Sequence, residues 1–138
     1  MNRGMSHALY LLMIVMIMVS CKEKPETKTL KVKATAYNSL PAQTHHNHPS
    51  ITAWGDSLKP GMKAIAVSRD LIDSGLTYQT KVRIEGLEGQ YIVLDKMHFR
   101  WKNRIDIYMG NNRDSALNWG VRDVRITWQI ERDISQKP

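Results

Sequence analysis

Alternation of apolar and polar side chains is the feature that most limits the fold of this 138-residue chain. A period of two places successive side chains on opposite faces of a β-strand, so each alternating segment is expected to bury one face. Glycine, proline and asparagine fall between these segments, where the chain must reverse. The candidate strands are Leu30–Tyr37, Met62–Ser68, Thr80–Gly86, Gln90–Asp95, Arg104–Gly110 and Val124–Glu131.

This pattern predicts a mainly β fold. Six short strands in one domain, with one or two short helices, favour a small closed or nearly closed barrel. Residues 113–118 are expected to be helical, with Gly120 as the stop. The residues expected in the core are Val82, Ile84, Ile92, Leu94, Ile105 and Ile107.

The N-terminal segment predicts export. Arg3 precedes an apolar run from Ala8 to Val19, which is too short to span a bilayer comfortably and is typical of a signal peptide. The run ends in Met18-Val19-Ser20-Cys21, which resembles the bacterial lipobox, and Cys21 is the only cysteine. Residues 1–21 are therefore interpreted as a lipoprotein signal peptide, with Cys21 as the lipidation site. The alternative is a transmembrane anchor, or a cleaved signal with an incidental cysteine.

The rest of the chain is expected to form one domain. Residues 22–28 are charged, contain Pro25 and lack an apolar period, so they are interpreted as a tether. The domain is expected to cover residues 29–132, followed by a tail at 133–138. The anchor would place the protein in the cell envelope, attached to a membrane and facing the periplasm from the outer membrane.

The chain is basic, with a formal net charge of +7. A basic domain attracts polyanions. An exported lipoprotein is not expected to bind nucleic acid, so anionic wall polymers and lipid headgroups are the expected partners, and a monomer is the expected state. The alternative is that the charge serves solubility alone.

A histidine cluster lies between the first two candidate strands. His45, His46 and His48 could ligate zinc or copper, but no cysteine or nearby acidic cluster completes a site. A solvated loop is the preferred interpretation, so neither a metal nor a cofactor is expected.

Several short motifs, in order, resemble the 3D domain. They are Ala34–Tyr37, Thr52–Gly55, Ile65–Ser68, Val82–Gly86, Val93–Asp95, Arg104–Gly110 and Ala116–Ile126. This family is named for three aspartates and has a double-psi β-barrel fold. It is similar to the catalytic domain of membrane-bound lytic murein transglycosylase A and to the stationary-phase survival proteins, and more distantly to rare lipoprotein A and the expansins. The resemblance covers residues 31–130 and implies a six-stranded double-psi β-barrel.

Two of the family's aspartates match Asp95 and Asp106. The first aspartate usually follows the end of the second strand, where this chain has Ser68, with Asp70 two places on. Lytic transglycosylases of this family cleave the β-1,4 bond between N-acetylmuramic acid and N-acetylglucosamine and form a 1,6-anhydro product. Because the sugar's own C6 hydroxyl is the nucleophile, one carboxyl group can act first as acid and then as base.

Asp106 suits that catalytic role. Ile105 and Ile107 point to one face of the strand, so the carboxyl group of Asp106 points to the other, which is expected to face a groove. Asp95 is expected to be the second carboxylate, which tunes Asp106 or binds the sugar. The alternative is that Asp106 is only the polar member of an alternating strand.

Further residues are expected to bind substrate. Aromatic rings stack on sugars, and cations pair with the carboxylates of peptidoglycan stems. The predicted substrate-binding residues are Tyr37, Trp54, Ser68, Asp70, Lys96, Trp101 and Lys102. A solvated basic loop remains an equal interpretation of residues 96–103. For the whole protein, the alternative to an enzyme is a non-catalytic peptidoglycan-binding or scaffolding lipoprotein.

Overall fold

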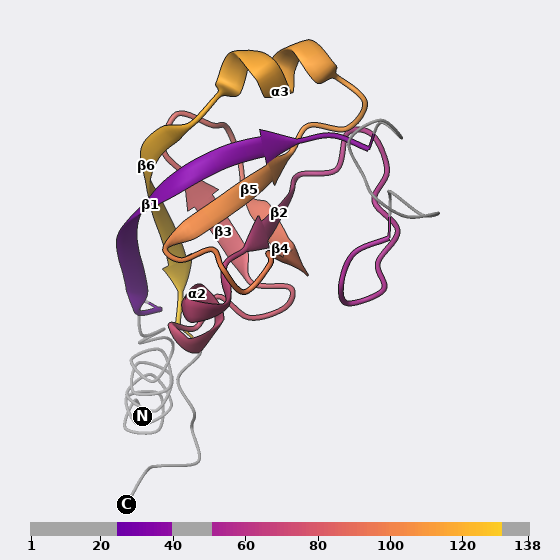
Figure 1. The fold of residues 1–138 in the computed structure, drawn as a ribbon. Helices are drawn as coiled ribbons and strands as arrows, with labels where there is room; N and C mark the ends of the chain where they lie inside the picture. Colours follow the sequence, from indigo (N-terminus) through magenta and orange to yellow (C-terminus); the bar gives the residue numbers. More distant parts are fainter. Residues whose placement is uncertain (1–24, 40–50, 131–138) are drawn as a thin grey trace, which may run out of the picture.

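The computed structural model describes residues 25–39 and 51–130. The strands are β1 (Thr27–Tyr37), β2 (Ala64–Val67), β3 (Lys81–Ile84), β4 (Tyr91–Lys96), β5 (Arg104–Tyr108) and β6 (Arg122–Gln129). They close into a barrel in the order β1-β5-β2-β4-β3-β6, with two short helices, α2 (Arg69–Asp73) and α3 (Arg113–Trp119), outside it (Figure 1). The predicted mainly β, six-stranded barrel with short helices is confirmed.

Some predictions lie outside the described residues. These are the signal peptide with Cys21, the first part of the tether, the histidine cluster and the C-terminal tail. Within the described ranges, no helix is long and apolar enough to cross a membrane. Strand β1 begins at Thr27, opposite Gln129 of β6, so regular structure starts two residues before the expected domain boundary at residue 29.

The strand pairing has an internal two-fold pattern. Strands β1 and β5 are parallel, and so are β2 and β4, whereas the other neighbouring pairs are antiparallel. Exchanging the first three strands with the last three leaves every pairing unchanged: β1/β5 becomes β4/β2, and β1/β6 becomes β4/β3. This arrangement is the double-psi barrel that the motif resemblance implied, although the sequence contains no internal repeat.

The barrel interior is filled by one apolar cluster. Ile105 and Ile107 of β5 and Val82 of β3 have no exposed surface, and Ile84 is almost as buried, as predicted. Trp128 of β6 is also buried in this cluster. Burial of each valine or isoleucine side chain contributes about 1.5–3 kcal/mol. The interior cluster therefore supplies most of the driving force for closing the barrel.

The prediction for Ile92 and Leu94 was wrong about which face they occupy. On β4 the interior positions are Tyr91 and Val93, while Ile92 and Leu94 belong to a second, smaller cluster with Leu58. A shift of one residue moves a strand's whole apolar set to the other face. The run from Tyr91 to Leu94 is apolar throughout, so the sequence does not show which alternate set points inward.

The second cluster covers part of the barrel's outer surface. Leu58, from the segment between β1 and β2, packs with Ala64, Leu94 and Tyr108, and Tyr37 lies against them. This segment loops out at one side of the barrel before it leads into β2 (Figure 1). Because it covers the outer face of β2, β4 and β5, polar side chains on that face are partly removed from water.

The two helices differ in how well the sequence predicted them. Helix α3 follows Asn112, whose side chain accepts a hydrogen bond from Ser115 N, and ends at Gly120 with φ 64°. The prediction of a helix here is confirmed, since asparagine is a good N-cap and glycine tolerates positive φ. Helix α2 was not predicted, because one helical turn is too short to show a period.

Candidate functional site

Asp106 lies on the outer face of the barrel wall, as predicted. Its neighbours Ile105 and Ile107 point into the core, whereas the Asp106 carboxyl group is only partly exposed on the opposite face. Thr35, paired with Asp106 across β1 and β5, donates a hydrogen bond from Oγ1 to Oδ1 over 2.9 Å. Oδ1 is therefore oriented by the barrel, and among the described residues Oδ2 has no hydrogen-bond partner.

Asp95 reaches the same face because of a β-bulge. Along β2, Ile65 pairs with Val93 but Ala66 pairs with Asp95, so Leu94 is the extra residue. Without the bulge, Asp95 would share the inward face of Val93. Bulges re-aim a side chain in this way, often next to active sites.

Ala66 separates the two aspartates. It pairs with Asp95 on one side and with Asp106 on the other. Since neighbouring strands lie about 4.8 Å apart, the two aspartate Cα atoms are about 10 Å apart. Ala66 itself is buried, at 5% exposure.

Tyr37 completes a cluster with the two aspartates, here called the aspartate cluster (Tyr37, Asp95 and Asp106). Burial raises the pKa of Tyr37 well above its usual value, and the charges of Asp95 and Asp106 raise it further. Its ring lies 5.4 Å from that of Tyr108, and its buried hydroxyl group has no hydrogen-bond partner among the described residues. Tyr37 therefore remains protonated, and its hydroxyl group keeps an unused hydrogen-bond donor inside the cluster.

The pKa of Asp106 is raised, mainly because burial disfavours the charged form. The hydrogen bond from Thr35 and the charge of Arg104 lower this pKa, and the charge of Asp95 raises it, but burial dominates. An acid catalyst needs such a shift to carry its proton near neutral pH.

Asp95 is more firmly held than Asp106. Burial raises its pKa, while hydrogen bonds from two backbone N–H groups oppose the shift. These donors are Ala53 N at 2.7 Å and Lys96 N at 2.8 Å, both to Oδ1. Asp95 thus fixes the turn that carries Trp54, whereas Asp106 accepts a hydrogen bond through Oδ1 only, among the described residues.

The raised pKa of Asp106 predicts a pH-dependent cost to stability. A carboxyl group with a raised folded-state pKa favours folding below its ordinary pKa of 3.8 and loses that contribution as pH rises through the folded value. The amide introduced by Asp106→Asn stays neutral at every pH, so the variant avoids this loss. Asp106→Asn is therefore expected to increase the free energy of unfolding relative to wild type by more at pH 8 than at pH 4, measured by urea denaturation.

Asp123→Asn is the matched control for this prediction. The exposed Asp123 has a lowered pKa because Lys33 and Lys31 lie beside it, so its small contribution is present at neutral pH and lost in acid. Its replacement should therefore decrease stability slightly at pH 8. An equal effect of Asp106→Asn at both pH values would show that Asp106 does not titrate abnormally.

An aromatic pair lies next to Asp95. The rings of Trp54 and Tyr78 are 5.3 Å apart, and the Lys96 ammonium lies 5.1 Å from the centre of the Trp54 ring. Tyr78 is 40% exposed and donates a hydrogen bond to Asp56 Oδ1 over 2.8 Å. The structure thus brings Tyr37, Trp54 and Lys96, three of the residues predicted to bind substrate, together with the aspartates.

Ser68 and Asp70 are placed differently from the prediction. Ser68 is fully buried and accepts a hydrogen bond from Arg104 N, so it cannot contact a ligand. Asp70 Oδ2 accepts a hydrogen bond from Asn103 N at 2.8 Å. Both side chains attach the start of β5 to α2, which is a structural role that the position of the family's first aspartate did not reveal.

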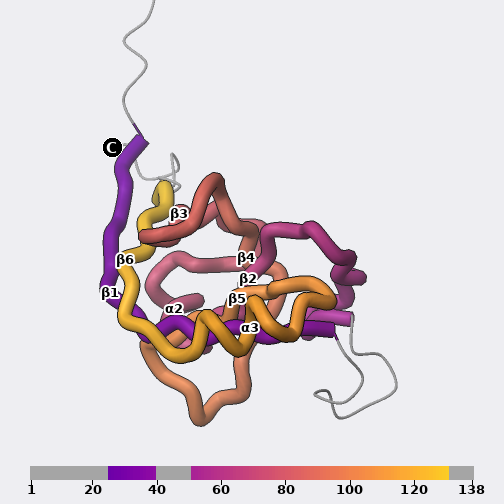
Figure 2. Tube along the Cα trace, turned by 90° about the horizontal axis from the view of Figure 1, so that it is seen from above, coloured from indigo at the N-terminus to yellow at the C-terminus, as the bar shows by residue number. Residues whose placement is uncertain are grey.

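Trp101 and Lys102 lie apart from the aspartate cluster. They line a pocket of about 310 Å³ with Lys31, Lys33 and Arg104. The connection between β4 and β5 that carries them projects from the barrel wall on the side away from β3 (Figure 2). These two residues therefore belong to a neighbouring pocket rather than to the cluster itself.

Three residues near the cluster were missed from the sequence. Thr35 shares a face with Tyr37, and Arg104 shares one with Asp106, so alternation within each strand could have identified both. Tyr78 comes from the loop before β3, and no pattern there marks it. Only the fold brings that loop to Asp56 and Trp54.

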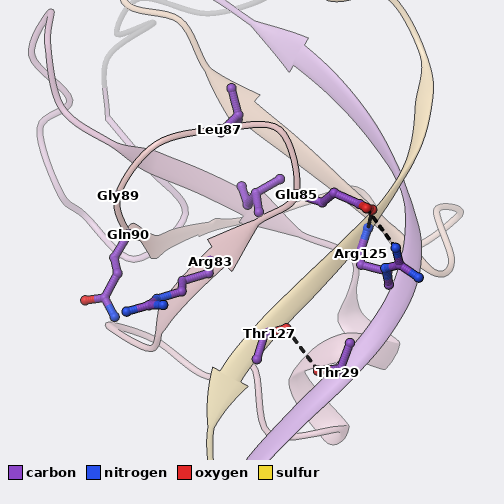
Figure 3. Close-up of a pocket in the computed structure, with 9 residues that line it drawn as sticks. Thr29, Arg83, Glu85, Leu87, Gly89, Gln90, Arg125 and Thr127 are labelled. Atoms are coloured by element: carbon purple, nitrogen blue, oxygen red, sulfur yellow. Dashed lines mark hydrogen bonds and ion pairs between the residues drawn. The ribbon is translucent and has the colours of Figure 1, made fainter.

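A larger concavity, of about 640 Å³, lies on the opposite wall, over β3 and β6. There Glu85 pairs with Arg125, and Thr29 contacts Thr127 (Figure 3). Glu85 is the only carboxylate among its lining residues, and the hydrogen bonds and charge of Arg125 lower the pKa of that group. Its chemistry does not provide a proton donor, so size alone does not identify the site.

Across the described ranges, no group of three or more histidine, cysteine, aspartate or glutamate side chains is arranged to hold a metal ion.

No protein-family model and no curated protein matches this chain. Solved structures with a similar fold include the apo form of an expansin from Clavibacter michiganensis, with a TM-score of 0.46, 20% identity and 77% of this chain covered. A point mutant of the same expansin in complex with cellohexaose has a TM-score of 0.44, with 16% identity over 80% of this chain. The chain matches about half of each expansin chain, 52% and 54%.

Proposed function

We propose that this protein is a lytic transglycosylase that cleaves the β-1,4 bond between N-acetylmuramic acid and N-acetylglucosamine in peptidoglycan. The observation that carries the proposal is Asp106: a carboxyl group with a raised pKa, oriented through one oxygen, on the outer face of the barrel. The motif resemblance assigns the position of Asp106 to catalysis. Next to it, Asp95 and the Trp54–Tyr78 pair offer groups that can hold a sugar.

The reaction would use Asp106 twice. The protonated carboxyl group donates its proton to the leaving glycosidic oxygen as the C1–O bond breaks. The resulting carboxylate then accepts the proton of the C6 hydroxyl group while the C6 oxygen attacks C1. This attack forms the 1,6-anhydro ring, and the carboxyl group is protonated again. No water is consumed, and the intramolecular nucleophile removes the need for a protein nucleophile.

The neighbouring groups would bind and orient the sugar. Tyr37 keeps its proton, and its buried hydroxyl group, which has no partner among the described residues, lies beside the two aspartates. Asp95 holds the turn with Trp54 through Ala53 N, and Trp54 with Tyr78 offers aromatic surface for a sugar ring.

A second candidate function is non-catalytic binding of peptidoglycan. The partly exposed Trp54–Tyr78 pair favours it, because such a pair binds sugar without any need for proton transfer. Incubation of the protein with purified sacculi separates the two functions: the enzyme releases 1,6-anhydro muropeptides, whereas a binding protein co-sediments and releases none.

The proposed location is the cell envelope, with a lipid anchor at Cys21. If Cys21 is acylated, Cys21→Ala should abolish incorporation of labelled palmitate and move the protein from the membrane to the soluble envelope fraction, because an acylated N-terminus holds a protein on a bilayer. Ser20→Ala keeps the thiol and is expected to retain the label. Unchanged membrane association of Cys21→Ala would contradict the lipobox interpretation.

A further inference from the structure

A cationic pocket lies beside the aspartate cluster and has no role in the proposed proton transfers. Its volume is about 310 Å³. It lies between β1, β6 and the connection that leads into β5. The lining residues are Lys31, Val32, Lys33, Trp101, Lys102, Asn103, Arg104 and Asp123.

Positive charge is in excess in this pocket. Asp123 is the only acidic residue in its lining, and it pairs with Lys31 at 3.5 Å and with Lys33 at 3.3 Å. The Arg104 guanidinium lies 4.0 Å from the centre of the Trp101 ring. Lys102 makes no ion pair or hydrogen bond through its ammonium group among the described residues, although its charge helps to lower the pKa of Asp70. One carboxylate cannot neutralise the four cations of the lining, so the pocket attracts an anionic group.

The pocket and the aspartate cluster share one surface. Lys33 pairs with Arg104, and two residues further along the same two strands Thr35 pairs with Asp106. Positions two apart in a strand point to the same face and are about 7 Å apart. A ligand along β1 and β5 can therefore contact Asp106 and the cationic pocket at once.

We propose that the cationic pocket binds a carboxylate on the peptide stem of the glycan strand held at Asp106. The inference rests on the proposed function, because it takes peptidoglycan as the ligand. A peptide stem begins on the muramic acid ring and extends by about 3.5 Å per residue, so its first carboxylates can reach the pocket. Paired lysines and a stacked guanidinium suit a planar carboxylate, which accepts several charge-assisted hydrogen bonds.

The test compares soluble peptide-bearing glycan strands before and after their stem carboxylates are converted to amides with carbodiimide and ammonia. This treatment removes charge and keeps size. Wild type should bind the untreated strands about tenfold more tightly than the amidated strands, measured by fluorescence titration. The double variant Lys33→Gln, Lys102→Gln should lose this preference and bind both kinds of strand as wild type binds the amidated ones.

The double variant Lys63→Gln, Lys81→Gln is the charge-matched control, because both lysines are exposed and neither lines the cationic pocket. It should keep the wild-type preference, and equal urea unfolding midpoints would show that all variants fold. Equal binding of both strands by wild type would overturn the inference. A competition experiment with inorganic polyphosphate gives a second contrary outcome. If polyphosphate displaces amidated and untreated strands equally well, the pocket attracts polyanions in general and the inference is wrong.

Failure of the inference can be distinguished from failure of the proposed function. Release of 1,6-anhydro products, with binding that is indifferent to stem charge, overturns only the role of the cationic pocket. Binding that depends on stem charge, without release of such products, supports carboxylate binding by the cationic pocket and contradicts the proposed transglycosylase activity.

Discussion

Asp106→Asn is expected to lower the rate of 1,6-anhydro product release from sacculi by about two to four orders of magnitude, which is the usual contribution of a positioned general acid or base. The amide keeps the shape of the side chain and can still accept the hydrogen bond from Thr35 Oγ1. It cannot give a proton to the leaving oxygen or take one from the C6 hydroxyl group. Glycan binding should therefore remain, while the chemical step is lost.

The controls for this variant use other aspartates. Asp73→Asn changes an exposed residue at the end of α2 and should leave the rate unchanged. Asp95→Asn should cost less than Asp106→Asn, because Asp95 accepts two backbone hydrogen bonds and acts by holding the Trp54 turn. If Asp106→Asn releases products at the wild-type rate, the assignment of the general acid is wrong.

Ile105→Ala is expected to lower the free energy of unfolding by about 2–5 kcal/mol, the usual cost of removing a large buried aliphatic side chain. Ile105 has no exposed surface and packs in the barrel interior, where the closed wall limits relaxation around a cavity. Because the unfolding of a small domain exposes a similar surface in both proteins, the loss should appear as a lower urea midpoint with an unchanged slope.

Leu117→Ala is the matched control for the interior. It removes similar atoms from α3, but Leu117 is 60% exposed, so the change should stay within about 0.5 kcal/mol. An equal loss for both variants would contradict the view that the interior cluster dominates stability.

Local patterns were enough to predict the barrel wall. Alternation in β5 placed Ile105 and Ile107 inside and Asp106 outside, because a strand of period two leaves no third choice. In β4 the same reasoning failed at Ile92 and Leu94, where apolar residues occupy both faces. A sequence carries no sign of a β-bulge, although this bulge places Asp95 beside Ala66.

The candidate site was only partly predictable for a similar reason. Tyr37, Asp95 and Asp106 come from three strands, and their proximity depends on the closed barrel order rather than on spacing in the chain. Ser68 occupies a motif position, but its burial and the hydrogen bond that it accepts from Arg104 N both depend on tertiary structure. The contact of Tyr78 with Trp54 also depends on tertiary structure alone.

Mass spectrometry of the soluble material released from purified sacculi measures the proposed cleavage itself. Wild type, Asp106→Asn and Asp73→Asn would be incubated in parallel, and each pellet would be assayed for bound protein. We expect 1,6-anhydro muropeptides from wild type and Asp73→Asn, almost none from Asp106→Asn, and bound protein in all three pellets. Wild-type protein that binds sacculi and releases no 1,6-anhydro muropeptide would contradict the proposed cleavage.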